Sequence, residues 1–163
     1  MKKLDINNIS RYSPYRVWMD GDEYLFESEH GILYAVNFEP EEMFGGITAY
    51  WFGLFNRSNK ASPSDVKVRA TVTCIIEEFF RQNPDILLYM CDSADDQQAM
   101  RSRLFIRWFN GYAEKQNFYI RTAMVMDEGE ENYIAIILQR SHPQLQMVIE
   151  TFDNVMEQFK ANK

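Results

Sequence analysis

Apolar and polar residues alternate along three runs in the first third of the chain, and this period of two is typical of strands with one buried face. The runs cover residues 24–27, 32–38 and 49–55, and the last is rich in aromatic side chains. Residues 29–31 end in a glycine and suit a hairpin turn between the first two runs. We therefore expect a hairpin that the third run extends into a meander, with a bulge at Gly53.

The pattern changes to a helical period after residue 60. Ser62 and Pro63 suit the N-cap and the first position of a helix that ends before Asn83. One face of this predicted helix is apolar and contains Val68, Val72, Ile75, Ile76 and Phe79. The continuous apolar run at residues 86–91 then predicts a strand that is covered on both faces.

The second half of the chain predicts another helix and a second hairpin. Ser93 suits the N-cap of a helix that continues to about Asn117. Residues 118–127 and 132–139 alternate as strands, and the acidic, glycine-containing residues 128–131 join them.

The C-terminal segment predicts a last helix that packs on the sheet. The sequence from Ser141 to Gln144 matches a capping box. A narrow apolar stripe follows at helical spacing, formed by Leu145, Val148, Ile149, Phe152, Val155, Met156 and Phe159. The predicted order is β-β-β-α-β-α-β-β-α, an α+β fold with a mixed, mainly antiparallel sheet of about six strands and three helices packed against it.

Length and composition narrow the class of protein. The 163 residues suit a single domain, 1–163, with the polar residues 1–16 as a less ordered or peripheral N-terminal segment. No apolar run approaches the roughly 20 residues that span a bilayer, and the N-terminus lacks the apolar core of a signal peptide. Cys74 and Cys91 lack the spacing of a zinc site, so we expect two reduced thiols in a cytoplasmic protein. The net charge of −7 disfavours nucleic acid as a partner.

The junction after the predicted strand at residues 86–91 is the main candidate site. Asp92, Asp95 and Asp96 gather there, and helical projection places Arg101 on the apolar face of the following helix. A charge directed inward needs an anionic partner, so Arg101 is expected to pair with at least one of these carboxylates. Three interpretations stay open: a structural ion pair, oxygen ligands for a magnesium-type ion with Arg101 on an anionic substrate, or anion binding at the helix start.

Outside this junction, the sequence contains only weak indications of a catalytic residue. Cys91 is either a buried thiol or a nucleophile with His30 or His142 as its base. The chain has no glycine-rich phosphate loop, serine elbow or histidine pair, so the sequence predicts neither a cofactor nor a metal and favours a protein that is not an enzyme.

Two further patterns concern binding surfaces. Arg103 and Arg107, with Trp108 and Trp51, would either stack on a single nucleic-acid strand or form an ordinary solvated helix face. The aromatic run at residues 50–55 is either core or an exposed patch for a protein partner.

The segments at residues 83–92, 96–98 and 101–109, together with the early hairpin, resemble the uncharacterised DUF6169 family of Bacteroidota. The resemblance implies a small bacterial protein and supplies no activity or site. We therefore predict a noncatalytic protein-binding or accessory module, which binds a protein partner or a second copy. Its alternatives are a metal-assisted phosphoester-type hydrolase at Asp92 to Arg101 and a nucleic-acid-binding module at Arg103 and Arg107.

Overall fold

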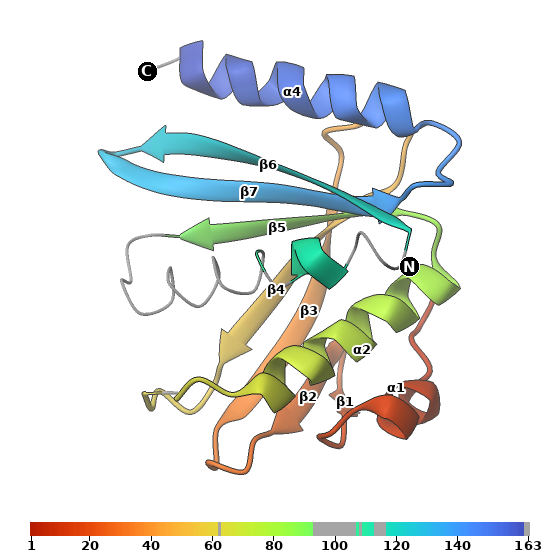
Figure 1. Ribbon diagram of the computed structural model, residues 1–163, viewed down its shortest axis with the longest axis vertical. Helices are drawn as coiled ribbons and strands as arrows, with labels where there is room; N and C mark the ends of the chain where they lie inside the picture. Colours follow the sequence, from red (N-terminus) through yellow and green to blue (C-terminus); the bar gives the residue numbers. More distant parts are fainter. Residues whose placement is uncertain (62, 93–106, 108, 113–116, 162–163) are drawn as a thin grey trace. The chain divides into compact units, whose positions relative to one another are not determined.

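The computed structural model describes residues 1–61, 63–92, 107, 109–112 and 117–161, and Figure 1 shows its elements. Within these residues the strands form one seven-stranded sheet of order β1-β2-β3-β4-β5-β7-β6, in which β1 and β2, β2 and β3, β5 and β7, and β6 and β7 pair in the antiparallel direction. The helices and strands are α1 (Ile6–Tyr12), β1 (Trp18–Asp20), β2 (Glu23–Glu27), β3 (Leu33–Glu41), β4 (Ala49–Asn56), α2 (Val66–Gln82), β5 (Ile86–Asp92), β6 (Phe118–Asp127), β7 (Glu130–Gln139) and α4 (Leu145–Ala161). The predicted α+β class is confirmed, with one strand more than the six expected.

The chain divides into two compact units. Unit 1 comprises Met1–Glu39 and Phe52–Asn83, and unit 2 comprises Pro40–Trp51 and Pro84–Lys163. None of the helices in the described residues is long and apolar enough to cross a membrane.

Unit 1 contains the predicted first hairpin. β2 and β3 pair from Tyr24↔Val36 to Glu27↔Leu33, and the expected meander continues into β4. The apolar face of α2 is buried in this unit, and Phe79 stacks on Phe38 of β3 with ring centroids 5.2 Å apart. A Cβ atom at Gly53 would lie 2.5 Å from Asn37 Oδ1, so the close approach of a neighbouring side chain accounts for glycine there.

The N-terminal segment holds two short elements that the hydrophobic pattern did not predict. α1 is capped by Asp5, whose carboxylate accepts from the backbone of Asn7 and Asn8, and its Ile9 is buried. The backbone N–H of Leu4 donates to the hydroxyl of Tyr24 at 3.0 Å. These contacts hold the N-terminus against the body of unit 1.

The start of α2 differs from the prediction. The helix begins at Val66, and its N-cap is Asp65, not Ser62. The carboxylate of Asp65 accepts from the backbone N–H of Lys67 at 2.8 Å, which is the bond that an N-cap side chain makes. Pro63 therefore precedes the helix and does not occupy its first turn.

Unit 2 is built on the second predicted hairpin. β6 and β7 pair over their full lengths, from Phe118↔Gln139 to Asp127↔Glu130, and β5 pairs with the other side of β7. The turn has two residues, Glu128 and Gly129, and not the four expected. Both have positive φ angles, 51° and 82°, which is the backbone of a type I′ turn.

α4 covers one face of the sheet in unit 2. The helix starts at Leu145, later than the predicted capping box at Ser141 would place it, and His142 Nδ1 accepts from the backbone N–H of Gln144 at 3.0 Å. The apolar stripe is confirmed in its central part, but Phe159 is 48% exposed. The core beneath α4 contains Phe44, Ala49, Ile86, Leu88, Val125, Ile134, Ile136, Leu138, Val148, Phe152 and Met156.

β5 is the strand expected to be covered on both faces. Its first four residues, from Ile86 to Tyr89, are buried, whereas Met90 is 50% exposed, so the prediction holds for only part of the strand. The helix expected from Ser93 lies almost wholly outside the described residues. Of its described residues, Phe109 is buried and its ring contacts that of Phe118.

Candidate functional site

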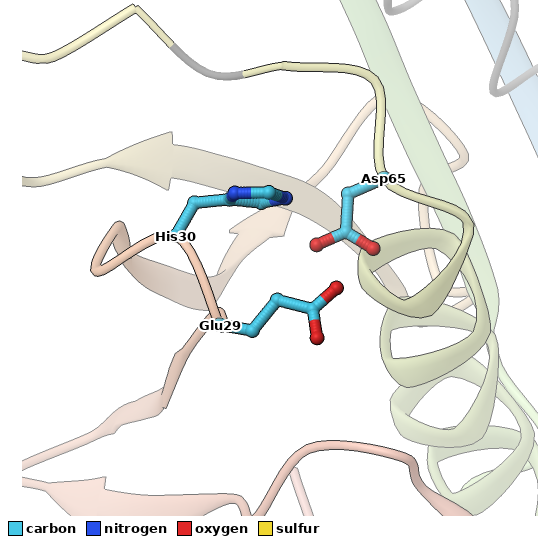
Figure 2. Close-up of side chains that lie close together, drawn as sticks. All are labelled: Glu29, His30 and Asp65. Atoms are coloured by element: carbon cyan, nitrogen blue, oxygen red, sulfur yellow. The ribbon is translucent and has the colours of Figure 1, made fainter.

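Three ligand-type side chains converge in unit 1, and we call Glu29, His30 and Asp65 the Asp65 cluster. One carboxylate oxygen from each acid and one imidazole nitrogen all lie within 4.8 Å of one another. Figure 2 shows that the three side chains point toward one another. Glu29 and His30 are exposed and Asp65 is half-buried, so the cluster lies at the surface.

Two local structures position the Asp65 cluster. Glu29 and His30 lie in the tight loop between β2 and β3, where the N–H of Gly31 donates to the carbonyl of Ser28 at 2.9 Å. Gly31 has a φ of 74°, a conformation that glycine adopts without steric cost. Asp65 is fixed independently because it caps α2. The hairpin loop therefore meets the beginning of the helix.

Tyr15 connects the two parts of the cluster. Its hydroxyl donates to Asp65 Oδ2 at 2.7 Å and accepts from the backbone N–H of Glu29 at 3.3 Å. Burial, and then the hydrogen bond to Asp65, raise the pKa of Tyr15 to about 12. The pKa of Asp65 is lowered: burial acts to raise it, but the bonds from Tyr15 and from the backbone of Lys67 and Val68 outweigh burial. Asp65 is thus held as a carboxylate and Tyr15 as a phenol.

Lys67 balances part of the negative charge. Its Nζ lies 3.1 Å from Glu29 Oε2, and both side chains are about half exposed. An ion pair at this exposure contributes less than about 1 kcal/mol to stability.

The Asp65 cluster has the donor set of a divalent-cation site, because two carboxylates and an imidazole suit zinc or manganese. However, both carboxylates already have partners: Asp65 accepts from Tyr15 and Lys67, and Glu29 pairs with Lys67. A cation would compete with the ammonium group of Lys67 for the carboxylate of Glu29. The contacts therefore account for the cluster as the network that caps α2 and fixes the β2–β3 loop.

Sequence reasoning did not find the Asp65 cluster. It treated Glu29 and His30 as residues of a hairpin turn and, with Ser62 as the N-cap, placed Asp65 inside the helix. The sequence does contain the two residues that fix the cluster locally, the glycine of the hairpin turn, Gly31, and the aspartate that caps α2, Asp65. Nothing in the sequence pattern indicates that these two local features meet.

The predicted junction site is only partly within the described residues. Asp92 is the last residue of β5, as expected for the end of that strand. Asp95, Asp96 and Arg101 lie outside the described residues, so their pairing and the magnesium hypothesis stay predictions. The same holds for the reactivity of Cys91.

The remaining candidates can be placed one by one. Cys74 is a free thiol and half-buried. Arg107 is exposed, as predicted for the polar side of its helix, while Arg103 and Trp108 lie outside the described residues. Trp51 is half-buried and its Nε1 donates to Glu41 Oε2 at 2.7 Å, so it does not form the exposed stacking platform proposed for nucleic acid.

The aromatic third strand, β4, is mainly core. Tyr50 and Phe52 are 8% and 4% exposed, and only Phe55 of this run is largely exposed. The alternative of an aromatic patch for a partner is therefore wrong for most of this strand.

A different surface is open in unit 2, at the outer side of β6. β6 is the last strand of the sheet, and in the described part of the chain it pairs with β7 alone. Val125 is buried under α4, whereas Thr122, Met124 and Met126 on the other face are exposed, both methionines at 40%. We call this ten-residue strand with its unpaired side the β6 edge.

The comparisons with known proteins bear on the family alone. None of the curated proteins matches the chain significantly. A family model described as "Family of unknown function (DUF6169)" matches residues 64–154, which run from the residue before the N-cap of α2 into α4 and make up more than half of the chain. The resemblance seen in the sequence is therefore confirmed, and the chain belongs to the DUF6169 family.

Proposed function

We propose that this protein is a noncatalytic module that binds an extended segment of a protein partner along the β6 edge. The observation that supports the proposal is the ten-residue length of β6 at the end of the sheet, unpaired on one side within the described residues. An edge strand offers a row of backbone N–H and C=O groups, and strand addition is a common way of binding peptides.

The residues of β6 do not discourage such pairing. Natural sheets protect their edges with very short strands, prolines or charges directed toward the edge. β1, at the other end of the sheet, is such a short strand, with three residues. β6 has neither proline nor glycine, and its segment from Thr122 to Met126 is uncharged.

The hairpin turn indicates which backbone groups are available. In a two-residue hairpin the flanking residues, here Asp127 and Glu130, form a hydrogen-bonded pair, and such pairs alternate along the ladder. Ala123 and Val125 therefore direct their backbone groups to β7. Thr122 and Met124 direct theirs to the open side, so the exposed residues are also the ones that would bond a partner strand.

A labelled ten-residue peptide of alternating threonine and valine, with a lysine at each end, tests the proposal. We expect saturable binding, measured by fluorescence polarisation, because every other residue can bond to the β6 edge. The matched control is the same peptide with N-methyl groups on alternate amides, which removes the donors without changing the side chains. Equal binding of both peptides, or of neither, would contradict strand addition.

A further inference from the structure

We draw no further inference here: the strongest candidate, the open side of β6 at the end of the sheet in unit 2, belongs to the site already described, and nothing in the described part of the chain shows which strand covers it.

Discussion

Replacing Asp65 with alanine should destabilise the protein by about 2 to 3 kcal/mol. The carboxylate makes two bonds that alanine cannot replace, to the backbone N–H of Lys67 at 2.8 Å and to the hydroxyl of Tyr15 at 2.7 Å. Loss of an N-cap costs about 1 kcal/mol. A hydrogen bond to a charged acceptor contributes about 1.5 to 3 kcal/mol, and we take the lower end because Asp65 is only half-buried.

The measurement is the free energy of unfolding from urea titration, with two variants that separate the contributions. Asp65→Asn should retain most of the cap, because asparagine caps as well as aspartate, and should lose about 1 kcal/mol through the weaker bond to Tyr15. Tyr15→Phe removes the hydroxyl alone. The double variant Asp65→Asn, Tyr15→Phe should then show a coupling of about 1 kcal/mol in the free energy of unfolding between the two positions. An Asp65→Ala variant within about 0.5 kcal/mol of wild type would refute the assignment of Asp65 as the cap of α2.

Three more predictions follow from single residues. The pKa of Tyr15 is raised from its ordinary value of 10.0 to about 12, so the stability that its phenol contributes is complete below pH 10 and is lost as the pH rises through about 12. In urea titrations at several pH values, the free energy of unfolding should therefore fall less at alkaline pH for Tyr15→Phe than for the wild-type chain. Phe152→Ala should lower the free energy of unfolding by about 3 to 5 kcal/mol because this ring of α4 is fully buried in the core, whereas Phe159→Ala, at a 48% exposed position of the same helix, should change it by less than about 0.5 kcal/mol. Burial, and then the charge of Glu77, raise the pKa of Cys74 to about 11, so its alkylation at pH 8 should be much slower in the folded protein than in urea, and equal rates would contradict this.

The strands of this fold could be predicted because alternation is a local property. β2, β3, β4, β6 and β7 each contain enough residues for a period of two to be visible. β1 has three residues and α1 has seven, too few to establish a period. The two helix starts were misplaced for a related reason: several capping residues occur in succession, and tertiary contacts such as that of Tyr15 with Asp65 select among them.

The Asp65 cluster and the β6 edge could not be predicted from the pattern of apolar and polar residues alone. The Asp65 cluster depends on the meeting of a hairpin loop and a helix start that are separated along the chain by β3 and β4. The β6 edge depends on strand order, and alternation cannot tell an outer strand from an inner one. The exposed methionines were visible in the sequence, but their significance came from the position of β6 at the end of the sheet.

The two-residue turn between β6 and β7 has a consequence for how the chain folds. Every pairing in this hairpin, from Asp127↔Glu130 outward to Phe118↔Gln139, closes a short loop, and hairpins of this kind form in about 1 to 10 μs. The pairing of Leu87 with Ile137 closes a much longer one. Because closing a longer loop costs more entropy, we expect the hairpin to form first and β5 to add to it later. Until then both sides of the hairpin are open, so the isolated hairpin would present two unpaired edges to other chains, whereas in the native sheet the described residues leave only its β6 side unpaired.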